Sequence, residues 1–183
     1  RYSSTVETSL EADIRRVVDS GAEVFLDEIE RSELSDNFWK VTLPLAMNSS
    51  STKSPPFLVF QAAQTHAGAR GFLSKNVTVA NMLEGAGDIH HLVPKNYLVK
   101  NGIRDRADYN QVANYALTET PVNIAIKDRA PAEYLGIVDE QVRGGALRIG
   151  EIADAASLAR SFADNAVPAS LAETDAESYG AFL

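Results

Sequence analysis

The character of the chain changes at residues 88–94, which have the sequence DIHHLVP. Apolar residues flank two adjacent histidines in this β-prone stretch, and the proline stops any strand that runs through them. Residues 112–117 (VANYAL) alternate apolar side chains and predict a second strand. Pro121 lies near the first turn of the helix that the following residues predict. The segment 88–127 therefore predicts a strand–loop–strand–helix unit, with the loop over residues 95–108.

The sequence on both sides of this unit predicts helices. Residues 1–34 place apolar side chains at helical spacing, with a break at Ser20-Gly21. Residues 47–54 (MNSSSTKS) predict a polar loop, and Ala-rich sequence after Ala130-Pro131 predicts further helices. The expected fold class is α+β and mostly helical, with a helical body that encloses the small unit. We expect one compact domain made of a helical subdomain (1–87), the unit itself (88–135) and a C-terminal helical extension (136–183).

The composition is that of an ordinary soluble globular protein, because 45% of the 183 residues are hydrophobic and 23% are charged. The longest apolar runs fall far short of the roughly 20 residues that a membrane span needs, so we expect no membrane contact. The absence of cysteine excludes a disulfide framework and a cysteine nucleophile, and it suits the cytoplasm. The chain begins at Arg1 without a charged-then-apolar leader. We therefore expect a piece of a larger protein with no targeting peptide in view.

The charge is unevenly distributed. Seventeen basic and twenty-five acidic residues give a formal net charge of −8, which argues against a protein that coats nucleic acid nonspecifically. Between His90 and Ala130, however, six basic and four acidic residues give +2, which leaves −10 for the remainder. The basic residues of this window are Lys95, Lys100, Arg104, Arg106, Lys127 and Arg129.

Four polar residues in the unit have side chains suited to catalysis. His90 and His91 are adjacent on the predicted first strand, so one imidazole can face a metal ion while the other faces a substrate. Asn114 lies in the second strand segment, and Asn123 lies near the start of the next helix. An asparagine carbonyl is a hard oxygen ligand that suits magnesium-like ions. Adjacent histidines are more often surface or capping residues than a site, and lone asparagines are more often turn or cap residues, so spacing alone does not establish a site.

The order His-His-Leu-Val-Pro, Asn114, Asn123 resembles the His–Asn–His/Asn motif of the HNH nucleases, also called His-Me finger or ββα-metal nucleases. The resemblance implies that His90 is the first metal ligand and His91 the general base. It further implies that Asn114 braces the loop between the strands and that Asn123 is the second metal ligand. Many members carry Asp or Glu in place of His90, which leaves the metal preference open. Asp88 is either an outer partner that orients His90 or a metal-bound water, or an exposed residue at the start of the strand.

Three stretches are similar to the C-terminal half of the large GmrSD-type bacterial restriction proteins: LSDNFWKVTLP (34–44), DIHHLVPKNYLVKNG (88–102) and NQVANYALTETPVNIAIKDRAPAEYL (110–135). Those proteins join an N-terminal nucleotide-binding, ParB-like domain to this nuclease domain. The resemblance implies metal-dependent hydrolysis of DNA phosphodiesters in phage defence. One divalent ion would take part, with Mg²⁺ expected and Mn²⁺ or another divalent ion as the alternative. No nucleotide should bind to this chain, because Gly144-Gly145 lacks the lysine and serine of a phosphate-binding loop.

The resemblance also implies partners. One partner is DNA, which this chain alone should bind weakly, and the other is the missing N-terminal domain of the same polypeptide. The oligomeric state stays open, with a homo-oligomer among the possibilities. The candidate phosphate contacts are Lys95, Lys100, Arg104, Lys127 and Arg129. Two alternatives compete with the nuclease. One is a degenerate nuclease domain with a structural or dimerisation role, and the other is a helical interaction protein, favoured by the acidic segments 1–34 and 151–183, in which the two histidines are incidental.

Overall fold

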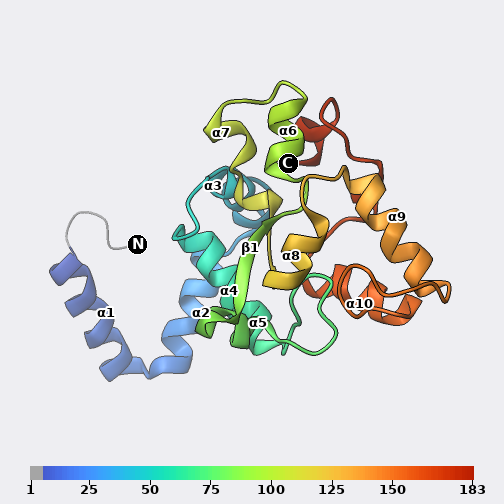
Figure 1. The fold of residues 1–183 in the computed structure, drawn as a ribbon. Helices are drawn as coiled ribbons and strands as arrows, with labels where there is room; N and C mark the ends of the chain where they lie inside the picture. The colour runs from blue at the N-terminus through green and yellow to red at the C-terminus, as the bar shows by residue number, and fades with distance from the viewer. Residues whose placement is uncertain (1–5) are drawn as a thin grey trace. The chain divides into compact units, whose positions relative to one another are not determined.

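Two short antiparallel strands make up the sheet of the computed structural model, which describes residues 6–183. They are β1 (Gly87–His91) and β2 (Tyr115–Glu119), paired in the register Gly87↔Glu119 to His91↔Tyr115. The helix α8 (Thr120–Ile126) follows β2 directly and packs against both strands. Its first turn therefore lies close to the strand that carries the two histidines (Figure 1).

The contacts divide the chain into two units, with the boundary between Ala46 and Met47. In the first unit, α1 (Val6–Ser20) and α2 (Ala22–Glu33) are separated at Gly21, whose φ of +88° a glycine adopts without strain. The predicted break at this position is confirmed, while residues 1–5 of the predicted helix lie outside the described residues. A π-helical turn (Phe38–Thr42) and α3 (Leu43–Met47) complete this part of the chain.

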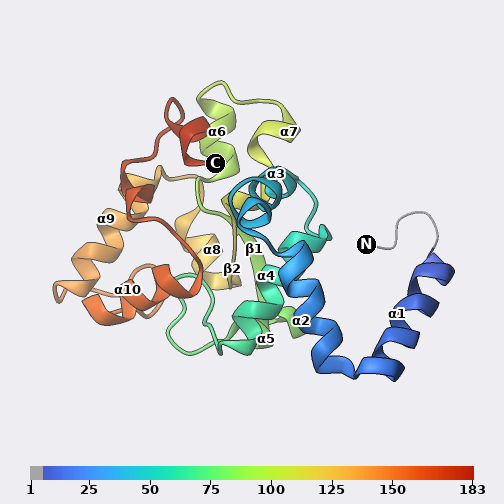
Figure 2. The same cartoon turned by 180° about the vertical axis from the view of Figure 1, so that it is seen from behind.

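The second unit contains the sheet and all of the predicted site residues. The helix α4 (Pro55–His66) lies beside the strands in both views, where Phe57 packs on Tyr115 of β2 (Figure 1, Figure 2). The remaining α-helices are α5 (Val79–Asn81), α6 (Lys95–Lys100), α7 (Arg106–Tyr109), α9 (Pro131–Val142), α10 (Ala155–Asp164) and α11 (Tyr179–Phe182), with a π-helical turn at Met82–Ala86 and a 3₁₀ helix at Ala169–Glu173. The mostly helical α+β class is confirmed. None of the described helices is long and apolar enough to cross a membrane.

The prediction of a loop over residues 95–108 is wrong, because α6 and α7 occupy most of this segment. Leu98 of α6 is completely buried, and Tyr97 and Val99 pack against the same core. The side chain of Asp105 caps α7 by accepting from the backbone N–H of Ala107 at 2.8 Å. A short helix anchored by one apolar side chain has too little periodicity to stand out from a sequence rich in Lys, Asn, Gly and Arg.

The second strand also differs from the prediction. Residues 112–114 form a 3₁₀ turn, and the strand itself begins at Tyr115 and continues to Glu119. The turn arises because Asn114 is fully buried and bonds to the chain at the end of β1, which holds its backbone out of the strand. Alternation of apolar residues continues through the turn, so the pattern alone does not separate the two conformations.

The main core lies between the sheet and the helices α8, α9 and α10. Its completely buried side chains include Phe72, Val93, Ile126, Tyr134 and Val138. The hydroxyl of Tyr134 donates to the backbone oxygen of Leu92 at 2.9 Å, which ties α9 to the residue after β1. The boundary that we expected after residue 135 falls inside α9, and the boundary after residue 87 falls inside β1.

Candidate functional site

Three of the predicted site residues form one hydrogen-bonded chain. Nδ1 of His90 lies 2.9 Å from Oδ1 of Asn123, and Nδ2 of Asn123 donates to Oδ2 of Asp88 at 3.3 Å. Residues 88 and 90 share one face of β1, and Asn123 reaches them from the first turn of α8. Because the amide nitrogen of Asn123 is held by the carboxylate, its oxygen faces His90, and Nδ1 of His90 carries the proton. Asp88 therefore orients Asn123, a partner that sequence reasoning did not consider.

The side chain of His90 is buried among aromatic rings. It is 2% exposed, its ring stacks on Phe72 with 6.0 Å between centroids, and it meets Tyr134 edge-on at 6.3 Å. Burial lowers the pKa of His90 to about 4, because water no longer stabilises the charged form, although the hydrogen bond with Asn123 opposes this shift. The imidazole is therefore neutral at neutral pH, which is the form that binds a metal ion.

The side chain of His91 has a different environment. It is half-buried, its ring meets Tyr115 edge-on at 5.0 Å, and its Nε2 lies 3.0 Å from Oδ1 of Asn110. Burial lowers the pKa of His91; the hydrogen bond with Asn110 opposes this shift, and the charge of Lys95 adds to it. The second histidine is thus also neutral at neutral pH, and it keeps access to solvent that the first one lacks.

Asn114 holds the chain together where β1 ends. Its side chain is completely buried; Oδ1 accepts from the backbone N–H of Val93 at 2.7 Å, and Nδ2 donates to the backbone oxygen of Val93 at 3.0 Å. The backbone oxygen of Asn114 also accepts from the N–H of Leu92 at 2.8 Å. The side chain of this residue therefore bonds to the backbone just after the histidines and not to the imidazoles themselves.

A pocket of about 280 Å³ brings the two histidines together with Asn123. Its other lining residues are Ile89, Pro94, Lys95, Asn96 and Lys127. Both histidines line it, although they are neighbours within β1 and His91 is the last residue of that strand. Lys127 ends α8 with φ +58°, a conformation that costs a non-glycine residue energy and that recurs at functional sites.

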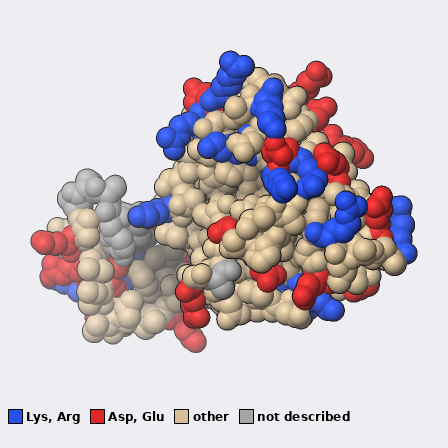
Figure 3. Space-filling view, in the orientation of Figure 1, with Lys and Arg blue, Asp and Glu red and all other residues tan. Residues whose placement is uncertain are grey.

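The structure brings two of the five candidate phosphate contacts to the pocket, Lys95 and Lys127. Lys100 forms an ion pair with Asp128 instead. Arg129 donates to the backbone oxygen of Ile126 at 3.0 Å and pairs with Glu133 at 3.2 Å, so it closes the end of α8. Arg104 is exposed in the connection between α6 and α7, where lysine and arginine side chains gather on the face seen in Figure 3.

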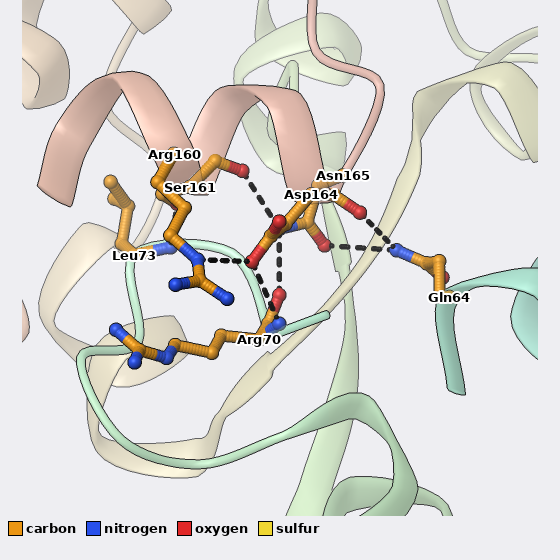
Figure 4. A network of polar contacts seen from close by, with 7 residues as sticks. All are labelled: Gln64, Arg70, Leu73, Arg160, Ser161, Asp164 and Asn165. Carbon is orange, nitrogen blue, oxygen red and sulfur yellow. Dashed lines mark hydrogen bonds and ion pairs between the residues drawn. The ribbon is translucent and has the colours of Figure 1, made fainter. Parts of the chain in front are cut away.

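The segment that carries Phe72 against His90 is held on two sides. On one side, the backbone N–H of Phe72 donates to the backbone oxygen of Leu117 in β2 at 2.7 Å. The hydroxyl of Thr118 donates to the backbone oxygen of Phe72 at 2.6 Å. On the other side, α10 and the residue after it bind the backbone of Arg70 and Leu73 (Figure 4). These bonds run from Arg70 N to Asp164 Oδ2 (3.0 Å), from Asn165 Nδ2 to Arg70 O (3.0 Å) and from Leu73 N to Ser161 Oγ (2.8 Å).

The contacts around His90 include groups that could hold a divalent metal ion. The amide of Asn123 contacts the imidazole of His90 through its oxygen and the carboxylate of Asp88 through its nitrogen. Imidazole nitrogen, amide oxygen and carboxylate oxygen are all common metal ligands. Within residues 6–183 no cluster of three His, Cys, Asp or Glu side chains is present. One of the three groups here is an amide oxygen, which suits a hard ion that keeps several waters.

Sequence reasoning missed Asn110 and Phe72. A lone asparagine in a polar stretch carries no signal, and the segment of Phe72 is tied to α10 by residues about 90 positions later in the chain. Comparison with protein-family models, with curated proteins and with solved structures gave no match. The interpretation of the site therefore depends on its own geometry and on the resemblance of the motif.

Proposed function

We propose that this chain is a metal-dependent DNA endonuclease of the HNH type, with a ββα-metal site made by β1, β2 and α8. The observation that carries the proposal is the pairing of two unlike histidines in one pocket. His90 is buried and bonded to Asn123, while its neighbour His91 stays neutral and accessible. A purely structural role does not require a buried histidine bonded to an asparagine and, next to it on the same strand, a second neutral histidine that solvent reaches.

In this proposal, His90 and Asn123 would hold the divalent ion, and the ion would offset negative charge on the phosphate and on the departing oxygen. For Nδ1 to bind the ion, the single proton of the neutral imidazole would have to be on Nε2, and the hydrogen bond between Nδ1 and Asn123 would be absent. Asp88 keeps the amide of Asn123 turned so that its oxygen faces His90. The low pKa of His90 means that the ring carries one proton and not two at neutral pH, so one of its two nitrogens keeps a lone pair.

His91 would act as the general base that takes a proton from the attacking water. Its pKa lies below the ordinary histidine value of about 6.5, so the base is unprotonated at neutral pH. Lys95 and Lys127 line the same pocket and would bind the phosphates on either side of the scissile bond. Such contacts supply affinity without reading sequence, and the net charge of −8 keeps binding by this chain alone weak. The nuclease would serve as one half of a larger restriction protein whose other half supplies nucleotide binding and most of the affinity for DNA.

The test is a plasmid-nicking assay with the purified chain across a titration of Mg²⁺ and Mn²⁺. The parent should nick DNA only with metal, and His91→Ala should lower the rate by about 10²–10⁴-fold, the usual contribution of a general base. The matched control is His66→Ala, which replaces the third histidine, exposed at the end of α4, and should cut like the parent. A parent without activity in any metal would favour the degenerate structural domain, and a fully active His91→Ala would overturn the assignment of the base.

A further inference from the structure

We propose that Asn110 is the positioning residue of the general base. Its side-chain oxygen holds the imidazole of His91 with the proton on Nε2, and Nδ1 is thereby the nitrogen that takes the proton from water. This inference depends on the proposed function, because it names the atom of His91 that does the chemistry.

The side chains of Asn110 and His91 share one hydrogen bond. Oδ1 of Asn110 lies 3.0 Å from Nε2 of His91, and an amide oxygen can only accept a hydrogen bond. Nε2 must therefore be the donor. A neutral imidazole carries one proton, so Nδ1 has a free lone pair. The bond on one ring nitrogen thus determines which nitrogen remains basic.

The position of Asn110 does not depend on its own side chain. Its backbone N–H donates to the oxygen of Arg106 at 3.1 Å, which places it directly after α7. The hydroxyl of Tyr179 donates to the backbone oxygens of Asp108 and Tyr109, at 3.2 and 3.4 Å, and so ties this end of α7 to the C-terminal helix α11. A variant that lacks the amide should therefore keep the loop in place.

A second contact limits the imidazole from another direction. Tyr115 of β2 meets the ring of His91 edge-on, with 5.0 Å between centroids and 82° between planes. The ring contact restricts where the imidazole lies, and the bond to Asn110 restricts how it is turned and protonated. The side chain of Asn114, four residues later, bonds to the backbone of Val93. The two asparagines therefore have separate roles.

The experiment combines nitrogen NMR of the histidine rings in the metal-free full chain with cleavage kinetics. In the parent at a pH where His91 is neutral, the ring N–H signal should come from Nε2 and be protected from exchange by the bond to Asn110. Asn110→Ala should lose that protection and lower kcat about 10- to 100-fold with KM nearly unchanged, since only the orientation of the base is affected. Asn110→Asp retains the acceptor oxygen and should restore both the signal and most of kcat.

The matched control is Gln111→Ala, since the side chain of Gln111 bonds to the backbone of Ala107 and leaves His91 untouched. It should show parent-like signals and rates. A parent whose ring proton lies on Nδ1, or an Asn110→Ala variant with the parent kcat, would overturn the role of Asn110 while the nuclease itself stands. An inactive parent whose Nε2–H is protected by Asn110 would instead overturn the proposed function, and with it any role of this contact in catalysis.

Discussion

Replacing His90 by glutamine should make the folded protein less sensitive to acid. Burial lowers the pKa of His90 to about 4, whereas a histidine in the unfolded chain has its ordinary value of about 6.5. Between these two pH values the unfolded state binds a proton that the folded state does not. The free energy of unfolding therefore falls as the pH drops through 6.5, and it continues to fall until the pH reaches about 4. Above this window the imidazole is neutral in both states and adds no pH dependence.

The size of the effect follows from the two pKa values. Each pH unit over which only the unfolded chain is protonated costs about 1.4 kcal/mol. Between about pH 7.5 and about pH 5, His90 should therefore reduce the free energy of unfolding by about 2 kcal/mol. Glutamine does not titrate, and its amide N–H can still donate to Asn123, so the variant should lack this contribution. A domain is usually stable by about 5–15 kcal/mol, so a change of this size is easily measured.

The assay is urea unfolding of the parent and of His90→Gln at a series of pH values, with a chelator present so that no metal contributes. The carboxylates are common to both proteins and cancel in the comparison. The parent should lose about 2 kcal/mol more than the variant between about pH 7.5 and about pH 5. Parallel curves would refute the argument, because they would mean that His90 takes up its proton as readily in the folded state as in the unfolded one.

Two further predictions concern the asparagines of the site. Asn114→Ala should lower the free energy of unfolding by about 2–4 kcal/mol, because it leaves the buried N–H and C=O of Val93 without partners. A loss below about 1 kcal/mol, measured by urea unfolding, would contradict the bracing role of Asn114. Asn123→Ala should lower the stability of the metal-free protein by about 1–3 kcal/mol, because the buried Nδ1–H of His90 loses its acceptor. The same variant should cut slowly and regain part of its rate with added Mg²⁺ or Mn²⁺ by mass action, and a cleavage rate that ignores metal concentration would exclude the ligand role of Asn123.

Much of the site was predictable because its signals are local. The β-prone residues before Pro94 predicted a strand that carries His90, and Pro121 predicted the start of the helix that carries Asn123. The spacing of two residues between Asp88 and His90 put both side chains on one face. The order of residues in the motif suggested that His90 and Asn123 would meet, and their side chains lie 2.9 Å apart. The bond from Asn123 to Asp88 was not foreseen.

The helices α6 and α7 were missed because their formation depends on contacts from far along the chain. Leu98 is buried in the core that Tyr134 and other residues of α9 complete, and Tyr179 ties the end of α7 to the C-terminal helix. Neither helix has enough turns to be stable by local propensity, so it forms only where tertiary packing supplies the remaining energy. Asn110 was missed for the same reason, since its place is determined by the end of α7.

The sequence by itself determined the mostly helical class, the strands that flank the site, and the residue types able to bind a metal and move a proton, because these depend on periodicity, proline positions and side-chain chemistry. Only the tertiary structure decided the protonation of the two histidines. Phe72, held by residues of α10 about 90 positions away, covers His90 and removes its water, while Asn110 and Tyr115 leave His91 at the pocket. The difference between a buried ligand and an accessible base is a difference in solvation, and solvation is set by neighbours that the fold supplies.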